Sequence, residues 1–489
     1  MQYGFVIDQE SCIGCHACTV ACKAENGVPV GDFRTWVKYV DAGKFPEVKR
    51  HFLVQRCNHC TNPPCVAICP VNALTKRADG IVDVDRDACI GCRACMQACP
   101  YDALYMNDDL KAVEKCHFCA HRVEQGMEPA CVTVCPVGAI IPGDFHDADS
   151  PVSRFIKAKP TKVRGEQQGT GPNVRYYGSV DAALRPGRAA RGDAYLWSER
   201  PNRKPEAWPA SLECDEATVA YDADHRIEWG WPVAAYLVTK SIAAGVAMFA
   251  PFARTFGIGG FAANYLPEIV ALFFTLVTTF FLVEDLGKPM AFLRMVTRPN
   301  WNSWLVKGAV ALGGFSALLV LSVLSRFAGL PALADVFRVL AALGSLVVAG
   351  YTALLFAQCK GRDLWESSWL LPHLIALAAQ CGAAFYLVFA PLDLGMRVVF
   401  VLSTIAHFGL ALYEWKRPHA TDNATQAAAF LSVVRLGPFG AFRDGLLASA
   451  VLAVVALLTY PPVAFVPVLF GLFLYEHAYV RAAQLPPLS

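Results

Sequence analysis

Cysteine is the residue whose number and spacing most clearly indicate chemistry in this sequence. The chain has 489 residues and 19 cysteines, and most of these fall into four runs of four. Thiolates two or three residues apart are typical metal ligands, whereas disulfide frameworks of this density belong to short secreted chains. The runs are Cys12, Cys15, Cys18, Cys22; Cys57, Cys60, Cys65, Cys69; Cys89, Cys92, Cys95, Cys99; and Cys116, Cys119, Cys131, Cys135. The spacing therefore predicts metal binding.

The pattern within the runs favours one kind of metal site. Three close cysteines and a fourth one further on form the ligand pattern of bacterial-type ferredoxins, and Pro70, Pro100 and Pro136 follow three of the runs. Gly14 and Gly91 lie between the first two cysteines of their runs, where a glycine lets the backbone approach inorganic sulfide closely. Structural zinc, the alternative, favours two separated cysteine pairs. The runs therefore predict four [4Fe–4S] clusters.

Residues 1–145 resemble the four-cluster electron-transfer subunit of the membrane-bound molybdopterin oxidoreductases, such as the dimethyl sulfoxide and polysulfide enzymes. The four runs and their order carry this resemblance. In that family the first run shares its clusters with the fourth, and the second run with the third. The resemblance implies these ligand sets: Cys12, Cys15, Cys18 with Cys135; Cys116, Cys119, Cys131 with Cys22; Cys57, Cys60, Cys65 with Cys99; and Cys89, Cys92, Cys95 with Cys69.

The rest of the sequence must hold these runs near their redox partner, and its composition points to a membrane. Hydrophobic residues make up 55% and charged residues 17% of the sequence, and the charged ones become sparse after Trp229. Soluble proteins average about 25% charged residues. A span takes about 20 apolar residues, and the candidate stretches are 231–253, 265–285, 304–325, 336–358, 369–390, 396–415, 441–460 and 462–482.

We therefore expect an α+β fold of ferredoxin-like dicluster repeats followed by an all-α polytopic bundle of about eight transmembrane helices. The domains would be residues 1–145, which hold four [4Fe–4S] clusters, a connector at 146–228 rich in Gly, Pro, Arg and Asp, and a membrane domain at 229–489. With eight spans, both ends of the membrane domain lie on the side of the cysteine domain.

Residues 229–485 resemble the polysulfide-reductase-type (NrfD-like) quinone-reactive membrane anchor. The matching stretches are Trp229-Gly230-Trp231-Pro232, Glu284-Asp285-Leu286-Gly287-Lys288-Pro289 and Arg298-Pro299-Asn300-Trp301-Asn302-Ser303-Trp304. The resemblance implies a quinone pocket among the first four helices, where Lys240, Asp285 and Tyr351 are the candidate residues for quinone chemistry.

The ionisable and polar residues of the spans give an independent argument. Charges inside a bilayer are costly, so they are candidates for function. Alternating the direction of the eight spans places one group of them in the leaflet nearest the cysteine domain: Lys240, Glu284, Asp285, Tyr351, His373, Glu476 and His477. In the structural alternative, Glu284 and Asp285 cap a helix end and Lys240 extends to the interface.

Together these features predict an electron-transfer and anchor subunit. Electrons would pass through the clusters between a separate molybdopterin-containing catalytic subunit and the membrane quinone pool, either menaquinone or ubiquinone. Primary substrate chemistry would belong to the partner, and quinone oxidation or reduction to the membrane domain. The alternative from another class is a redox-driven subunit that translocates protons or ions.

Two further expectations concern haem and location. A two-haem bundle needs paired axial histidines, but His373, His407 and His477 lie in three different spans, so no haem is expected. A net charge of +2 does not indicate nucleic-acid binding. We expect a multi-pass protein of the bacterial inner (cytoplasmic) membrane, in contact with lipid. An excess of Lys and Arg in the loops beside the cysteine domain, and no export signal in Met1–Glu10, place that domain in the cytoplasm.

Overall fold

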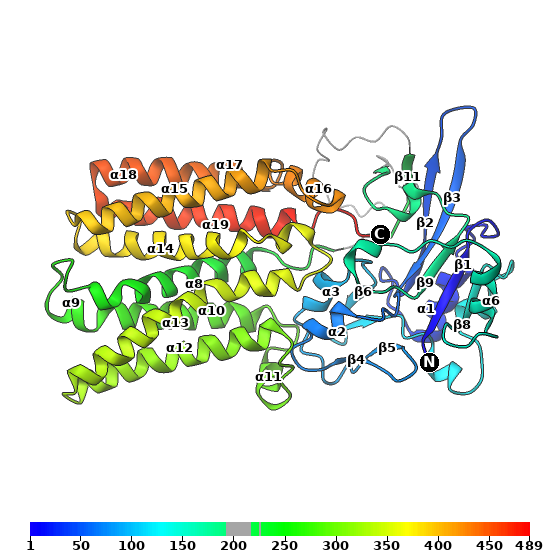
Figure 1. Cartoon of the computed structure of the whole chain (residues 1–489), viewed down its shortest axis with the longest axis horizontal. Coiled ribbons are helices and arrows are strands. Elements are labelled where there is room, and N and C mark those ends of the chain that lie inside the picture. Colours follow the sequence, from blue (N-terminus) through cyan, green and yellow to red (C-terminus); the bar gives the residue numbers. More distant parts are fainter. Residues whose placement is uncertain (192–216, 224–225) are drawn as a thin grey trace.

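The protein folds into a helical bundle and a smaller mixed α/β part that lie end to end (Figure 1). This computed structural model describes residues 1–191, 217–223 and 226–489. Part of the predicted connector, at 192–216 and 224–225, therefore lies outside the described residues. The predicted fold class, ferredoxin-like elements followed by an all-α membrane bundle, is confirmed.

Two sheets and two hairpins form the scaffold of the cysteine-rich part. The first sheet has the order β8-β1-β9, and the second has the order β10-β11-β2-β3. The sheet strands are β1 (Tyr3–Asp8), β2 (Thr35–Ala42), β3 (Lys49–Arg56), β8 (Ile140–Asp144), β9 (Val174–Tyr177), β10 (Ala190–Arg191) and β11 (Ala217–Tyr221). The hairpins pair β4 (Leu74–Lys76) with β5 (Val82–Val84), and β6 (Leu104–Asn107) with β7 (Ala112–Lys115).

Each cysteine run ends within a short helix or no more than two residues after one. These helices are α1 (Ala17–Asn26), α2 (Pro64–Ile68), α3 (Ala94–Ala98) and α5 (Ala130–Thr133), while α4 (Ala120–Val123) follows Cys119. Gly14 and Gly91 have φ values of +70° and +73°, a left-handed conformation that glycine adopts without strain. The loops before the helices therefore turn tightly, which gathers the cysteines.

Residues of the predicted connector add to the cysteine-rich part. β9 runs parallel to β1, and β11 pairs antiparallel with β2. The remaining elements here are α6 (Pro151–Ala158), η1 (Glu166–Gln168) and α7 (Asp181–Leu184). The described part of this segment is thus integrated into the sheets that carry the cysteine loops.

Eight helices, counted in the described part of the chain, are long and apolar enough to cross a membrane. They match the eight predicted stretches, and the seventh contains a π-helical turn, η6. Their elements are α8 (Trp231–Phe249) with η3 (Ala250–Phe252), α10 (Leu266–Glu284), α12 (Trp304–Phe327), α13 (Pro331–Ala357), α14 (Leu370–Phe389), α15 (Leu394–Lys416), α17 (Ala441–Leu446) with η6 (Leu447–Leu452) and α18 (Ala453–Thr459), and η7 (Pro461–Ala464) with α19 (Phe465–Ala482).

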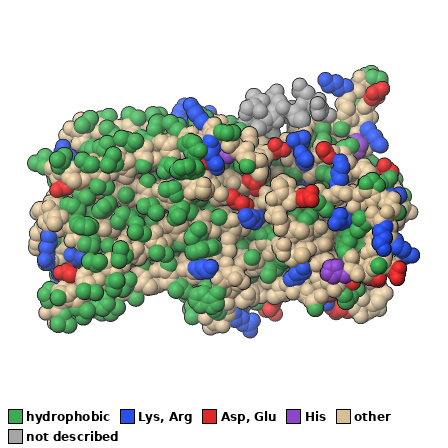
Figure 2. Space-filling view, in the orientation of Figure 1, with side chains coloured by type: hydrophobic (Ala, Val, Ile, Leu, Met, Phe, Trp, Pro, Cys, Tyr) green, Lys and Arg blue, Asp and Glu red, His purple; other side chains and the backbone are tan. Residues whose placement is uncertain are grey.

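Shorter elements join the spans. They are α9 (Gly260–Asn264), η4 (Pro289–Leu293), α11 (Arg294–Thr297), η5 (Asp363–Glu366), α16 (Asp422–Phe430) and the pair β12 (Arg435–Leu436) and β13 (Phe439–Gly440). Apolar side chains cover the outside of the bundle, whereas charged ones gather on the cysteine-rich part (Figure 2). Such a surface suits lipid, and the molecule is an integral multi-pass membrane protein.

The two parts share one hydrophobic core. Cys89, Cys95 and Leu104 belong to the same buried cluster as Trp229 and Phe356 of the membrane half. A second core, which includes Phe5, Cys18, Phe118 and Cys131, lies at the distant end of the cysteine-rich part. At the C-terminus, the Lys38 ammonium donates a 2.7 Å hydrogen bond to the carbonyl of Ser489. Both ends of the membrane half therefore meet the cysteine-rich part.

Candidate functional site

Four cysteines from the first and fourth runs surround one small cavity. Cys22, Cys116, Cys119 and Cys131 line it, together with the guanidinium-bearing residues Arg34 and Arg56. Cys22 comes from α1 and Cys131 from α5, and these two helices are in contact. This is the second ligand set that the resemblance implied.

Four cysteines from the second and third runs surround another cavity. Cys69, Cys89, Cys92 and Cys95 line it, and its other walls include apolar residues such as Ile90 and Val113. The helices that bear or precede these cysteines, α2 and α3, pack against each other. This grouping is the fourth implied ligand set.

For the other two implied sets, the structure shows only that some members are near one another. The Cys12 thiol interacts electrostatically with those of Cys135 and Cys15, and the Cys60 thiol with those of Cys57, Cys65 and Cys99. The set with Cys12 is at the protein surface, where Cys15 is exposed, whereas Cys57, Cys60, Cys65 and Cys99 are all buried.

The donor sets fit [4Fe–4S] clusters better than single ions. In the described residues, no three His, Cys, Asp or Glu side chains converge as a single-ion site requires. Instead, the sulfurs stand around a space, and backbone amides of His59, Phe118 and Ala139 point at cysteine sulfurs at 3.3–3.5 Å. Arg56 lines one such space, and two nitrogens of its buried guanidinium have no hydrogen-bond partner. Wide thiolate sets with surplus N–H donors suit a cluster with sulfide ligands.

A loop of the membrane half holds the cysteine set Cys69, Cys89, Cys92 and Cys95 from outside. The amides of Gly287 and Lys288 donate to the carbonyls of Gly91 and Ile90 at 3.2 and 3.1 Å. The side-chain amide of Asn300 donates a 2.8 Å hydrogen bond to the carbonyl of Cys69. Gly287, Lys288 and Asn300 belong to the stretches of sequence that resemble NrfD-like anchors.

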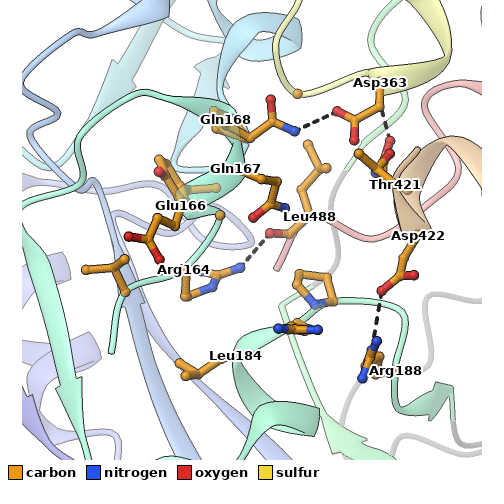
Figure 3. Close-up of a pocket in the computed structure, with 18 of the residues that line it drawn as sticks. Arg164, Glu166, Gln167, Gln168, Leu184, Arg188, Asp363, Thr421, Asp422 and Leu488 are labelled. Carbon is orange, nitrogen blue, oxygen red and sulfur yellow. Dashed lines mark hydrogen bonds and ion pairs between the residues drawn. The ribbon is translucent and has the colours of Figure 1, made fainter. Parts of the chain in front are cut away.

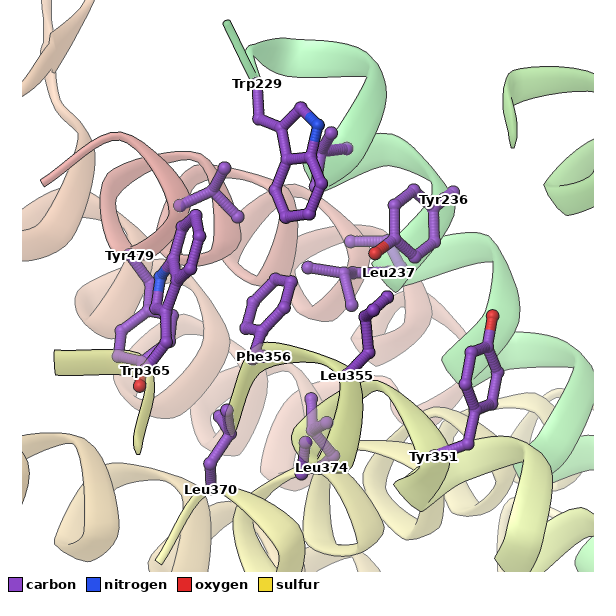
Figure 4. Packing of buried hydrophobic residues seen from close by; sticks show 14 of the residues in the cluster. Trp229, Tyr236, Leu237, Tyr351, Leu355, Phe356, Trp365, Leu370, Leu374 and Tyr479 are labelled. Atoms are coloured by element: carbon purple, nitrogen blue, oxygen red, sulfur yellow. The ribbon is translucent and has the colours of Figure 1, made fainter. Parts of the chain in front are cut away.

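An aromatic stack connects the same set to the helices. Trp229 donates from its indole nitrogen to the carbonyl of Cys92 at 3.4 Å. Its ring stacks on Trp365 and Phe356, with centroid distances of 5.6 and 6.0 Å. Figure 4 shows the three side chains within the buried cluster. The cavity of the fourth cysteine set therefore lies at the membrane boundary.

Two of the three predicted quinone-site residues lie together. The buried Lys240 ammonium is 4.9 Å from the ring centroid of Tyr351, and it donates to Thr352 Oγ1 at 2.6 Å and to the carbonyl of Ala349 at 3.1 Å. Tyr236, which the sequence reasoning missed, lies on the same helix as Lys240 and near Tyr351 (Figure 4). Lys240 therefore points into the bundle and does not extend to the interface.

Asp285 lies at the end of α10 and faces the cysteine loop. Arg93, directly after Cys92, donates a 3.0 Å bond to the Asp285 carbonyl and lies 3.6 Å from its carboxylate. Arg93 also forms a 3.1 Å ion pair with Glu228. Burial raises the pKa of Asp285 to about 6, although Arg93 opposes this effect. Burial likewise raises the pKa of Glu228, again against Arg93. Arg93 was also missed, although its place inside the run could have marked it.

Other polar residues of the spans form two separate groups. His373 and His407 share a 2.8 Å hydrogen bond, and His407 contacts Ser449 Oγ at 3.0 Å. Farther from the cysteine-rich part, Arg338 and Glu268 form a buried 2.5 Å ion pair that Ser322 also joins. Glu284, Glu476 and His477 lie at the cysteine-domain ends of their helices, as predicted.

A cleft of about 740 Å³ lies between the connector residues and the loops of the membrane half (Figure 3). Paired polar side chains line it: Gln168 donates to Asp363 at 2.7 Å, and Arg188 lies 3.3 Å from Asp422. None of the predicted ligand cysteines or quinone-site residues is among its lining residues.

Comparison with known proteins matches the two halves separately. A "4Fe-4S binding domain" model matches residues 3–24, a "4Fe-4S dicluster domain" model matches residues 48–145, and a "Polysulphide reductase, NrfD" model matches residues 221–398. The last match ends within α15.

Among curated proteins, a tetrathionate reductase subunit of Salmonella typhimurium is 44% identical over 202 residues, which cover 40% of this chain and 80% of the relative. A polysulfide reductase chain of Wolinella succinogenes is 42% identical over 176 residues, covering 35% of this chain and 92% of the relative. "Arsenate respiratory reductase iron-sulfur subunit ArrB" of a Shewanella species is 35% identical over 227 residues, covering 36% and 96%.

Proposed function

This protein belongs to the family of reductase iron–sulfur subunits, here fused to an NrfD-type membrane domain, and we propose that it links a catalytic partner to the quinone pool. It is an iron–sulfur electron-transfer subunit with its own membrane anchor. The proposal adds four [4Fe–4S] clusters on the sixteen cysteines of the runs, a molybdopterin-containing partner, and a quinone site in the membrane half.

One observation carries the proposal: the fourth cysteine set is built into the membrane boundary. The backbone amides of Gly287 and Lys288 donate hydrogen bonds to the loop of this set, and Trp229 donates to the backbone carbonyl of Cys92. A subunit that exchanged electrons only with soluble partners would need no such junction. The junction supports transfer between this cluster position and a quinone in the helices.

The opposite end of the cysteine-rich part supports a partner subunit. Cys15 is exposed, and several apolar side chains around the first and fourth runs are exposed with it. They are Ile13 (57%), Val20 (64%), Val134 (40%) and Val137 (41%). Exposed apolar residues beside a cluster position suit a docking surface through which electrons pass. The relatives' names describe them as parts of reductases, which agrees with such a partner.

The membrane residues support quinone chemistry. Lys240 and Tyr351 supply an ammonium and a hydroxyl in a buried region, and these can donate to quinone oxygens. Asp285, with its pKa near 6, can take up or release the proton that accompanies quinone reduction or oxidation. Arg93 connects this carboxylate to the loop of Cys92.

Metal content and quinol-linked reduction test the proposal. Anaerobically purified protein should carry about sixteen iron atoms, four per predicted cluster. A short-chain quinol should reduce the clusters of the purified full-length protein, as seen by EPR. Stoichiometric zinc with little iron, or full iron that no quinol analogue can reduce or oxidise, would contradict the proposal.

A buried hydrogen-bonded network favours proton translocation as a second candidate function. Tyr475 contacts His373 at 3.4 Å, His373 bonds His407, and His407 bonds Ser449, so four groups that carry exchangeable protons connect α19, α14, α15 and η6. The π-helical turn presents Ser449 to this network. In proteoliposomes, proton translocation should fall in the His407→Gln variant while quinone turnover persists. Equal proton translocation by the wild type and the variant would show that the network does not carry protons.

A further inference from the structure

Arg56 is a buried cation that pairs with no carboxylate in the described part of the chain and leaves two of its nitrogens without a hydrogen-bond partner. Its side chain is 1% exposed and lies at the end of β3. Nη1 donates to Cys131 Sγ at 3.2 Å, and the guanidinium carbon is 4.4 Å from the centroid of the Phe5 ring. In the described part of the chain, no carboxylate forms an ion pair with Arg56, and its Nε and Nη2 lack any hydrogen-bond partner.

An isolated buried charge with orphaned donors is strongly destabilising in a protein. The neighbouring Arg34 shows how the fold normally treats such a group, because Glu114 lies 3.1 Å from its guanidinium. Arg56 lines the cavity of Cys22, Cys116, Cys119 and Cys131, and two nitrogens of its side chain are buried without a hydrogen-bond partner. An anion in that space would satisfy both the charge and the donors.

The position of Arg56 also connects two cysteine sets. The Arg56 guanidinium interacts electrostatically with the thiols of Cys116 and Cys131, which belong to the second implied set, and with the Cys18 thiol of the first set. The first set includes the exposed Cys15, whereas Cys22, Cys119 and Cys131 of the second set are buried. Arg56 therefore lies where electrons would pass between the surface and the interior.

We propose that Arg56 is a positioning residue that donates hydrogen bonds to the sulfur atoms of the cluster held by Cys22, Cys116, Cys119 and Cys131. This assignment rests on the proposed function. Hydrogen bonds to the sulfurs and the local charge set the reduction potential of a cluster. A cation stabilises the reduced, more negative form, so Arg56 raises the potential of this cluster relative to an uncharged wall.

An EPR-monitored redox titration of the full-length protein tests the assignment. Arg56→Gln should lower the midpoint potential of one cluster, with at least a tenfold change in its reduction equilibrium, which is about 59 mV for one electron. Arg56→Lys keeps the charge but loses the planar set of donors, so it should give a smaller shift in the same direction. The clusters near the membrane should keep their potentials in both variants.

Arg164→Gln is the matched control. Arg164 is 2% exposed, and it bonds the side chain of Gln55, next to Arg56, and the carbonyl of Leu488. It lines neither cysteine cavity described above, so its loss should leave all the potentials unchanged. An equal shift in the Arg164 and Arg56 variants would show a general structural effect and overturn the assignment.

A measurement on the unaltered protein does not depend on the variants folding. With ¹⁵N-arginine incorporated, pulsed EPR of the reduced protein should detect nitrogen coupling to one cluster, and Arg56→Lys should abolish it. The absence of this coupling, or full iron content with unshifted potentials in Arg56→Gln, would overturn the role of Arg56 alone. Zinc in place of iron would instead overturn the proposed function.

Discussion

Replacing Asp285 by asparagine removes a negative charge from the junction between the cysteine loop and α10 while preserving the shape of the side chain. Asp285 lies directly after the second span, and its carboxylate is 3.6 Å from Arg93. Arg93 keeps its ion pair with Glu228 and its bond to the residue 285 carbonyl in the variant. The change therefore tests the carboxylate with little disturbance of the loop.

The expected effect on stability follows from the pKa of Asp285. Burial raises it from 3.8 to about 6. The unfolded protein releases the proton at lower pH than the folded protein, so folding stability falls as the pH rises from about 4 to about 6. At 1.36 kcal/mol per pKa unit, the ionised carboxylate costs up to about 3 kcal/mol above pH 6. Asp285→Asn should lack this loss and be more stable than the wild type at pH 7.5.

The expected effect on activity is the opposite. If Asp285 exchanges a proton with quinone, its removal should lower quinone-linked turnover by about a hundredfold, the lower part of the range for general acid–base groups. The pH dependence of quinone-linked turnover near pH 6 should be absent in the Asp285→Asn variant. The assays are thermal unfolding in detergent at pH 5 and pH 7.5, and quinol-driven cluster reduction across the same range.

Asp335→Asn is the control, because Asp335 pairs with Arg326 at the opposite end of the bundle. It should change neither the quinone kinetics nor their pH profile. Wild-type quinone kinetics in Asp285→Asn would remove this residue from the quinone site. Lower stability than the wild type at pH 7.5 would refute the argument from burial.

Three further predictions concern the helices, the loop and the orientation. Tyr351→Phe should impair quinone-linked turnover by about tenfold or more with full iron content, and unchanged kinetics would contradict its role. Gly91→Ala should lower iron content, because a Cβ there would lie 2.8 Å from the Gly287 Cα, whereas Gly126→Ala shares a positive φ but meets open space and should retain iron. A reporter joined by a flexible linker after Ser489 should be fluorescent in the cytoplasm, and active alkaline phosphatase there would place the cysteine-rich part outside.

The cysteine runs and the spans could be predicted because their signals are local. Ligands two or three residues apart belong to one loop, and about 20 apolar residues make one span. Spacing alone left open which runs share a cluster, and the family resemblance supplied the pairing. The structure places the cysteines of two of these sets around cavities, as the resemblance implied.

The quinone-site prediction was less complete because it depended on depth in the membrane. Alternating the direction of the spans placed Lys240 and Tyr351 at a similar depth in the membrane, and the fold brings their side chains into contact. The same reasoning grouped Asp285 with them, but its carboxylate and its carbonyl both interact with Arg93 of the cysteine loop. Depth along a helix says nothing about which way a side chain faces, so the partner of Asp285 could not be foreseen.

By itself, the sequence determined that this protein has cluster-type ligand loops and a polytopic membrane half, since covalent spacing and apolar length are properties of short segments. Only the tertiary structure decided which loop meets the membrane and which charges accompany it. Arg93 and Asp285 are 192 positions apart, and Arg56 and Cys131 are 75 apart. Contacts over such separations arise from packing around a common core, and such packing leaves no local pattern in the sequence.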